Sequence, residues 1–467
     1  MLPNKAEFTK LDLLALFGNK SLINIPDGWH CIGVSTDTRE IINDNAFVAL
    51  RGENSDGHAR VAEAFSKGAS AVFVEKTWYE ENKSRFSSSP FVVVDNTLHA
   101  LGKLGNEHRR RFNLPIIAIG GSNGKTTTKN LTAHVLSQKY KVLKTEANYN
   151  NQLGVPLMLL QLNSDYDIAV LEMGTNEPGE ISILTNYVEP THGLITNIGK
   201  EHLEKLIDLD GVELEETYLF GFLLKRNGTA FINMDDVRLE KYIKLLDEKV
   251  LFGTTENANI RGVIELDNKL HPKIDIDYND RHIEANMKTF GYTCGLNAIA
   301  AASVGFHFDF NNEEIKIGLE SFVQDTGHGY ARMLVENIKG LEIINDCYNA
   351  NPDSMTAALN TLKNIKTSSP KIAILGDMRE LGEASFNEHC NILEIANESA
   401  ENIYITGSEM KKAFEAISDK VKIKYFPDKD ELLDFILKHL HKEDIVLVKG
   451  SRGMEMEKII IGLKEKF

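Results

Sequence analysis

A glycine-rich turn between an apolar run and a helical stretch is the feature that most constrains this 467-residue chain. Residues 120–127 read Gly-Gly-Ser-Asn-Gly-Lys-Thr-Thr, follow the apolar run 116–119 and precede a helical pattern at 128–139. Glycines let backbone N–H groups turn toward an anion, and the N-terminus of a helix adds positive potential. A strand, this turn and a helix in that order predict a phosphate-binding loop in an α/β sheet.

Individual side chains of this turn suit a nucleotide with a divalent cation. Lys125 can reach terminal phosphates, and the Thr126 hydroxyl can contact Mg²⁺. The predicted ATP-binding residues of the loop are Gly121, Ser122, Asn123, Gly124, Lys125, Thr126 and Thr127. The strict GxxxxGK[ST] spacing is not met, because Ile119 stands at its first glycine. A glycine turn with a chance Lys-Thr pair is the alternative.

Short β-branched runs alternate with helical stretches along the whole chain, which is typical of parallel α/β sheets. At roughly 150 residues per domain the length predicts about three domains. We expect a smaller α/β domain at 1–113, a central domain at 114–327 and a C-terminal domain at 328–467. The central domain should hold a mostly parallel sheet of the phosphate-loop type, and the C-terminal domain a doubly wound, Rossmann-like sheet. The predicted strands are 71–74, 91–94, 116–119, 168–171, 193–196, 229–232, 341–344, 371–375, 403–406 and 445–448.

A predicted helix at 98–112 ends in the basic triplet 109–111. A solvated helix end is the preferred interpretation, since cations suit the negative pole of a helix. A phosphate-binding patch is the alternative.

Composition excludes several classes of protein. With 52 Lys and Arg against 68 Asp and Glu, the formal charge is −16, which argues against a nucleic-acid partner. The four cysteines form no CxxC pair, so a reduced compartment is expected. We see no export signal, and the apolar runs are too short for a membrane span. These features predict a cytoplasmic protein.

Two further polar residues lie near predicted strand ends. Glu172 directly follows the apolar strand 168–171, and His202 lies just beyond the strand 193–196. Ligands of α/β sheets bind at the carboxyl edge, so both could share an edge with Lys125. Taken alone, Glu172 is most often a surface or capping residue and His202 an ordinary helix histidine.

Several ordered segments together resemble the ATP-dependent Mur ligase family, and the resemblance covers almost the whole chain. It is strongest to the branch that adds D-alanyl-D-alanine. The matching segments are 35–39 (Ser-Thr-Asp-Thr-Arg), 47–52, 56–58, 145–156, 346–355 (Asp-Cys-Tyr-Asn-Ala-Asn-Pro-Asp-Ser-Met), 375–383 and 448–452.

The resemblance implies roles for particular residues. Together with the residue-level reasoning above, it leads us to expect Lys125, His202 and Glu216 as catalytic residues and Thr126, Glu172 and His202 as metal contacts. Further nucleotide contacts are implied at Asn297, Arg332 and Asp346. The implied substrate-binding residues are Thr38, Arg39, Asn148, Asn150, Asn151, Asn349, Asn351 and Lys449.

The bare sequence leaves simpler interpretations of some of these residues open. Asn351 before Pro352 is typical of a helix N-cap with proline at the first position, so it could merely begin a helix. The segment 449–452 could be a turn with solvated charges rather than a site for a substrate carboxylate.

The sequence departs from the family pattern at two places. Glu216 stands where the family usually has a lysine that is carbamylated, and Tyr218 stands at a neighbouring glutamate. An unperturbed Glu titrates near pKa 4.3, so we expect Glu216 to be a permanent carboxylate at neutral pH. The alternative is that 213–216 forms a solvated acidic face. Thr293 and Cys294 replace the usual His-Asn pair ahead of Asn297.

The resemblance implies an ADP-forming amide-bond ligase that uses ATP and Mg²⁺ through an acyl phosphate. The implied substrates are UDP-N-acetylmuramoyl-tripeptide and D-alanyl-D-alanine, in peptidoglycan precursor synthesis, and we expect a monomer. The alternatives are a paralogous ligase for another amino acid or peptide, and a nucleotide-binding protein without ligase activity.

Overall fold

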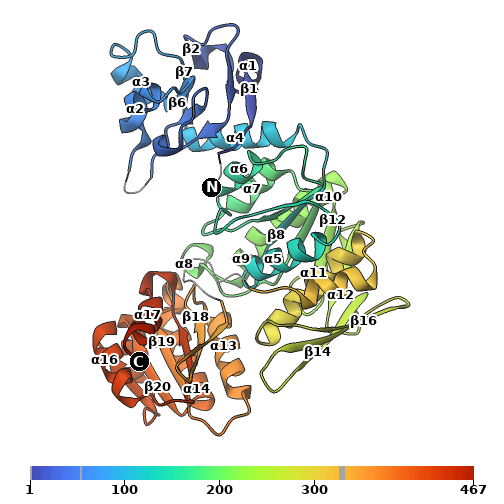
Figure 1. Ribbon diagram of the computed structural model, residues 1–467, viewed down its shortest axis with the longest axis vertical. Coiled ribbons are helices and arrows are strands. Elements are labelled where there is room, and N and C mark those ends of the chain that lie inside the picture. Colours follow the sequence, from blue (N-terminus) through green and yellow to red (C-terminus); the bar gives the residue numbers. More distant parts are fainter. Residues whose placement is uncertain (1–2, 53–54, 325–331) are drawn as a thin grey trace. The chain divides into compact units, whose positions relative to one another are not determined.

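The computed structural model describes residues 3–52, 55–324 and 332–467 and has an α/β architecture (Figure 1). Its three larger sheets have five, nine and six strands, in chain order, which confirms the predicted fold class. The chain forms two compact units, one of residues 1–118, 140–175 and 179–192, the other of 119–139, 176–178 and 193–467. The proposed boundary at 327/328 lies outside the described residues, and the domain limits stay predictions.

The five-stranded sheet of the first unit has the order β2-β7-β6-β5-β4. Strands β4 to β7 are parallel, and β2 pairs antiparallel with β7. The strands are β2 (Leu22–Ile23), β4 (Val34–Ser35), β5 (Ala46–Val48), β6 (Ala71–Glu75) and β7 (Phe91–Val94). A separate antiparallel pair joins β1 (Glu7–Thr9) and β3 (His30–Ile32). The accompanying helices are α1 (Lys10–Phe17), α2 (Val61–Ser66), α3 (Lys76–Asn82) and α4 (Thr97–Arg109).

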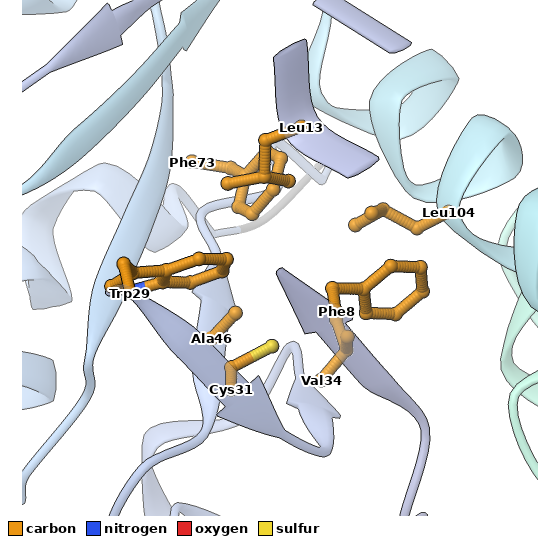
Figure 2. Close-up of a pocket in the computed structure, with 8 residues that line it drawn as sticks. All are labelled: Phe8, Leu13, Trp29, Cys31, Val34, Ala46, Phe73 and Leu104. Atoms are coloured by element: carbon orange, nitrogen blue, oxygen red, sulfur yellow. The ribbon is translucent and has the colours of Figure 1, made fainter. Parts of the chain in front are cut away.

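The core beneath this sheet is apolar and closely packed. Figure 2 shows side chains converging on one point, and they leave no space that a water molecule could occupy. These side chains are Phe8, Leu13, Trp29, Cys31, Val34, Ala46, Phe73 and Leu104. The one polar group of the indole is satisfied, because Trp29 Nε1 donates to Ser70 O at 3.1 Å. We therefore assign this region to the hydrophobic core rather than to a ligand site.

The basic triplet at the end of α4 is exposed at Arg110 and Arg111, as expected of a solvated helix end, but all three arginines also make tertiary contacts. Arg109 donates to the Val188 and Glu189 carbonyl oxygens, and Arg110 pairs with the Glu189 carboxylate. Arg111 pairs with Asp12. These arginines therefore bind the last carbonyls of a neighbouring helix and nearby carboxylates, a tertiary role that periodicity does not encode.

The nine-stranded sheet has the order β16-β15-β14-β13-β12-β11-β8-β10-β9. Strands β12, β13 and β14 are parallel, whereas β14, β15 and β16 form an antiparallel meander that the sequence analysis missed. Its strands are β8 (Ile116–Gly120), β9 (Val142–Lys144), β10 (Ile168–Glu172), β11 (His192–Ile195), β12 (Thr229–Asn233), β13 (Lys249–Gly253), β14 (Ile260–Leu266), β15 (Pro272–Tyr278) and β16 (Arg281–Asn286). The helices in this part of the chain are α5 (Lys125–Leu136), α6 (Gly154–Leu159), α7 (Glu180–Val188), α8 (Leu203–Leu206), α9 (Leu209–Glu216), α10 (Tyr218–Arg226), α11 (Tyr292–His307) and α12 (Asn312–Glu320).

The six-stranded C-terminal sheet has the order β17-β18-β22-β19-β20-β21, with only β17 antiparallel to its neighbour. Its strands are β17 (Leu334–Ile338), β18 (Leu341–Asp346), β19 (Lys371–Gly376), β20 (Asn402–Thr406), β21 (Ile423–Phe426) and β22 (Ile445–Lys449). The helices are α13 (Pro352–Asn364), α14 (Ser385–Ser399), α15 (Ser408–Ala416), α16 (Lys429–His439) and α17 (Glu457–Lys466). Figure 1 shows α16 and α17 on one side of this sheet and α13 and α14 on the other, as expected for a doubly wound sheet.

Among the described residues, no helix is both long enough and apolar enough to cross a membrane.

The C-terminal core generates a stability prediction. Ile374 on β19 is fully buried against Ile343, Ile436 and Val448. Ile374→Ala should therefore lower local stability by about 2–5 kcal/mol through lost burial and a residual cavity. Hydrogen exchange of the β19 amide groups measures this loss. Val421→Ala serves as control, since Val421 is 95% exposed; equal exchange in both variants would contradict the assigned core.

Candidate functional site

The predicted phosphate loop connects β8 to α5, and α5 begins at Lys125, three residues earlier than expected. Gly121 and Gly124 have φ of +106° and +84°, which side-chain-bearing residues rarely adopt. A Cβ on Gly121 would lie 2.3 Å from Thr196 Oγ1, so only glycine fits here. Gly124 is the N-cap residue of α5 and offers no side-chain cap, which leaves the positive end of the helix for a ligand.

The segment 196–205, which follows β11, holds this loop through backbone and amide groups. Ser122 N donates to Asn197 O at 2.8 Å, and Gly199 N donates to Ser122 Oγ at 2.8 Å. Asn123 N donates to Asn197 Oδ1 at 3.1 Å, while Asn197 Nδ2 donates to Asn123 O at 3.0 Å. Asn197 was not predicted, and its place after the neighbouring strand is the only local signal of its role.

Lys125 lies among oxygen atoms at the start of α5. Its Nζ is 3.2 Å from Glu201 Oε2 and also donates to the Gly121 carbonyl. Glu201 is 6% exposed, and its Oε1 has no hydrogen-bond partner within the described residues. Glu201 was not predicted, although it directly precedes His202.

Glu216, the last residue of α9, is fully buried against the phosphate loop. Its Oε2 accepts a 2.6 Å hydrogen bond from Gly121 N, and a Cβ on Gly120 would lie 2.7 Å from the same oxygen. Its Oε1 has no hydrogen-bond partner among the residues that the structure describes. The helix α9 therefore brings a carboxylate to the loop, at the position where the family usually has a lysine.

The alternative of a solvated acidic face at 213–216 is wrong. Glu213, Glu215 and Glu216 are all buried, and Glu213 pairs with Arg238 and Lys241. Leu214, the remaining residue of the run, is the one exposed to solvent. The helix therefore turns its three carboxylates toward the protein interior and its leucine toward solvent.

Burial also changes the charge expected at Glu216. Desolvation raises its pKa to about 8; Lys125 opposes this shift, and the Glu201 carboxylate adds to it. The expectation of a permanent carboxylate at neutral pH is therefore wrong for the ligand-free protein. The unperturbed value was expected because the burial of this helix end cannot be recognised from the sequence alone.

His202 is the N-cap residue of α8 and has a φ of +48°. Its Nδ1 lies 2.5 Å from Glu380 Oε2, and its Nε2 lies 3.9 Å from Glu201 Oε2. The structure thus brings two predicted catalytic residues, Lys125 and His202, to the same carboxylate oxygen, Oε2 of Glu201. Glu216 reaches the same loop through Gly121.

Two residues that the resemblance assigned to different ligands form a buried pair in the C-terminal sheet. Lys449 Nζ donates to Asp346 Oδ2 at 2.6 Å, and the two residues lie opposite each other on β22 and β18. Lys449 is 2% exposed. Asp346 Oδ1 also accepts from Met333 N at 3.1 Å, next to Arg332. The Arg332 guanidinium lies over the Tyr348 ring, 4.3 Å from its centroid.

Asn351 is confirmed as a helix N-cap but has a second contact. Its Oδ1 accepts from Ser354 N, completing a capping box at the start of α13. Its Nδ2 donates to Asn123 Oδ1 of the phosphate loop at 3.0 Å. Asn349 lies nearby, where its Oδ1 accepts from Ala350 N and Arg452 N.

Asn297 on α11 lies against the phosphate loop, since a Cβ on Gly124 would be 2.6 Å from its Oδ1. Cys294, one turn earlier, is buried, and burial raises the pKa of its thiol to about 11. Thr126 and Thr127 lie in the first turn of α5. The departure from the family at Cys294 therefore places an uncharged thiol near this loop.

Glu172 belongs to the first unit, where it is the last residue of β10 rather than the residue after the strand. It is 2% exposed, and its Oε1 accepts from Asn150 Nδ2 at 2.9 Å. Asn151 Oδ1 accepts from the backbone of Gly154 at 2.9 Å, so it shapes the turn before α6, and Asn148 lies in the same loop. Glu172 was predicted as a metal contact and Asn150 as a substrate contact, and the structure joins the two by this hydrogen bond.

The other predicted substrate residues of the first unit lie after β4. Thr38 is buried, and its carbonyl accepts from Lys67 Nζ. The Arg39 side chain is 85% exposed and pairs with Asp37 at 2.5 Å. Arg39 therefore presents a guanidinium at the surface of this unit.

Comparison with known families matches most of the chain. Residues 119–305 match the Mur ligase middle domain, and residues 331–452 match the Mur ligase glutamate ligase domain. The UDP-N-acetylmuramoyl-tripeptide–D-alanyl-D-alanine ligase of Bacillus subtilis (strain 168) is 32% identical over 438 residues, 93% of both chains. The ligase of the same name from Buchnera aphidicola subsp. Baizongia pistaciae is 35% identical, over 93% of this chain and 92% of that one.

Solved structures give the same result. A MurF crystal structure from Acinetobacter baumannii superposes with a TM-score of 0.88 at 29% identity, covering 99% of this chain and all of that one. A MurF ligase from Thermotoga maritima in complex with ADP has the same fold, with a TM-score of 0.82 at 24% identity. Phosphate loop, strand-end carboxylates and full-length similarity together place the chain in the Mur ligase family.

Proposed function

We propose that this chain is an ATP-dependent ligase that adds D-alanyl-D-alanine to UDP-N-acetylmuramoyl-tripeptide. The observation that carries the proposal is the similarity to ligases of that name, at 32–35% identity over 93% of this chain. In the proposed reaction a substrate carboxylate takes the terminal phosphate of ATP, and the resulting acyl phosphate is attacked by the amine. An amide forms, and ADP and phosphate leave.

Such a reaction depends on positioning and on neutralising crowded negative charge. Lys125 supplies a positive charge at the start of α5, next to backbone N–H groups whose direction is fixed by Gly121 and Gly124. We expect phosphate oxygens to replace the carbonyl of Gly121 and the carboxylate of Glu201 as partners of Lys125. Asn297, Arg332 and Asp346 are proposed as further nucleotide contacts.

The residues near Lys125 fit a magnesium ion. Glu201 and Glu216 each bury a carboxyl oxygen that has no hydrogen-bond partner in the described chain, and oxygen donors are those that Mg²⁺ prefers. The proposed metal contacts are Thr126, Glu172 and His202, with Glu216 supplying the charge that the family takes from a carbamate. Bound Mg²⁺ would supply positive charge beside the transferring phosphate.

The proposed substrate contacts are those of the matched segments. Thr38 and Arg39 are assigned to the nucleotide-sugar part of the acceptor, and Asn148, Asn150 and Asn151 to its peptide part. Asn349, Asn351 and Lys449 are assigned to D-alanyl-D-alanine. A substrate carboxylate would have to compete with Asp346 for Lys449, because the two are paired at 2.6 Å. A cytoplasmic location and a monomeric state belong to the same proposal.

The first prediction from the proposed function concerns the reaction itself. Phosphate release from ATP should require both UDP-N-acetylmuramoyl-tripeptide and D-alanyl-D-alanine, and Lys125→Ala should lower the turnover number by about 100- to 1000-fold. Lys139→Ala, beyond the end of α5, is the matched control and should keep turnover. Release that prefers another amine would favour a paralogous ligase. Nucleotide binding without amine-dependent release would favour a protein that is not a ligase.

The second prediction concerns the charge at position 216. Carbamylation of a lysine needs CO₂, whereas Glu216 carries its own carboxyl group, so added bicarbonate should leave the turnover number unchanged. Glu216→Gln should lower the turnover number. The Glu216→Lys variant should be inactive without bicarbonate and become active when bicarbonate is added. Glu240→Lys, an exposed position in the same unit, is the control. Bicarbonate activation of the unmodified protein would contradict this role.

The third prediction concerns stability and pH. The pKa of Glu216 is raised by burial from 4.5 to about 8, so the folded protein binds more protons than the unfolded chain between these values. Glu216 therefore lowers stability progressively as pH rises through this window. With nucleotide absent and cations chelated, Glu216→Gln should raise the melting temperature more near pH 8 than near pH 5. Glu240→Gln should show no such pH-dependent difference; if Glu216→Gln behaves in the same way, the raised pKa is wrong.

A further inference from the structure

The segment 196–205 is bound to the C-terminal part of the same compact unit on both sides of His202. His202 Nδ1 lies 2.5 Å from Glu380 Oε2, and Glu204 N donates to Glu380 O at 3.0 Å. One residue, Glu380, thus contacts this segment through both its side chain and its backbone. A Cβ on Gly382 would come within 3.1 Å of Glu204 Cα, so the two backbones approach closely here.

Both partners of the His202–Glu380 contact have a left-handed backbone. The φ angles are +48° at His202 and +62° at Glu380, and neither residue is glycine. Such conformations cost free energy and persist only where surrounding contacts hold them, which is common at functional sites. The backbone therefore adopts an unfavourable conformation on both sides of one side-chain contact.

The contact decides which ring nitrogen of His202 is available. A carboxylate only accepts, so Nδ1 must carry the proton that it donates to Glu380. In the neutral ring, Nε2 then holds the lone pair. This atom lies 3.9 Å from Glu201 Oε2, and Glu201 contacts Lys125 at 3.2 Å. The lone pair of His202 is thereby directed toward the cluster of Lys125 and Glu201.

We propose that Glu380 is a positioning residue that fixes the tautomer and orientation of His202, so that Nε2 faces the Lys125–Glu201 cluster. Carboxylates that accept from the second nitrogen of a metal-contacting histidine have this effect in other proteins. The proposal rests on the metal contact assigned to His202 in the proposed function. Because Glu380 lies between β19 and α14, His202 is oriented only while the C-terminal part contacts the segment 196–205.

The chain offers a matched control next to this contact. Lys200 Nζ pairs with Glu388 at 2.6 Å, and Lys200 N donates to Asp353 Oδ2 at 2.7 Å. These bonds tie the same segment to the same part of the chain without touching the imidazole. A variant at Glu388 thus weakens the attachment of the segment, whereas a variant at Glu380 also removes the acceptor of Nδ1.

The test is ¹⁵N NMR of the full chain labelled at histidine, without nucleotide or metal, with the His202 signals assigned by their loss in His202→Gln. We expect the Nδ1–H tautomer in the unmodified protein, its loss in Glu380→Ala, and its retention in Glu380→Gln, whose amide oxygen can still accept. Glu388→Ala should keep the tautomer. An Nε2–H tautomer in the unmodified protein, or an unchanged tautomer in Glu380→Ala, would overturn the proposal.

A second readout uses Mn²⁺ as the probe, counted by electron paramagnetic resonance in the presence of an ATP analogue. Glu380→Ala should weaken Mn²⁺ binding by about 10- to 100-fold, with a smaller effect for Glu380→Gln. Unchanged binding in Glu380→Ala would overturn the role assigned to Glu380. The tautomer is read without substrates, so a correct tautomer in a protein that releases no phosphate would contradict only the proposed function.

Discussion

The hydrogen bond from Gly121 N to Glu216 joins the phosphate loop to the end of a helix, and the two residues are 95 positions apart in the sequence. It places a fully buried carboxyl behind the proposed phosphate-binding loop, which is unfavourable unless a positive charge lies close by. Lys125 is that charge, and Glu201 on its other side makes the balance two carboxyl groups to one amine. Without a cation, the protein meets this imbalance by retaining a proton at Glu216.

The same loop is also held by uncharged hydrogen bonds to the segment 196–205. The Asn197 side-chain amide accepts from Asn123 N and donates to Asn123 O, and Gly199 N donates to Ser122 Oγ, so contacts within the protein shape the loop. These bonds occupy the N–H groups of Ser122 and Asn123, so they fix the shape of the loop rather than offer these donors to a ligand. The loop geometry therefore comes from the strand β11 and its continuation, while the charge comes from α5 and α9.

Much of this arrangement could be predicted from the sequence, because parallel strands and the phosphate loop leave local signals. All ten predicted strands exist, with ends shifted by a residue or two, and Asn351 caps α13 as its proline neighbour indicated. The meander of β14 to β16 was missed, although 272–278 alternates in period two. Glu201, Asn197 and Glu380 were missed for a different reason. Their roles come from contacts between distant segments, and nothing in their local sequence distinguishes them from surface polar residues. The resemblance located Glu216, but its pKa follows from burial, which only the packing of α9 determines.

Asn351 uses both ends of one amide, since Oδ1 caps α13 while Nδ2 reaches Asn123. The helix α13 has 13 residues, so at 1.5 Å per residue it is a rigid rod about 20 Å long. Its N-cap is attached to the proposed phosphate loop, and its body packs on the C-terminal sheet. A shift of the loop by a fraction of an ångström would act on this helix at its N-terminal end. A displacement of the loop would then reach the sheet that carries Asp346 and Lys449 through the first turn of α13, where Asn351 contacts the loop and Asp353 contacts the segment that holds it.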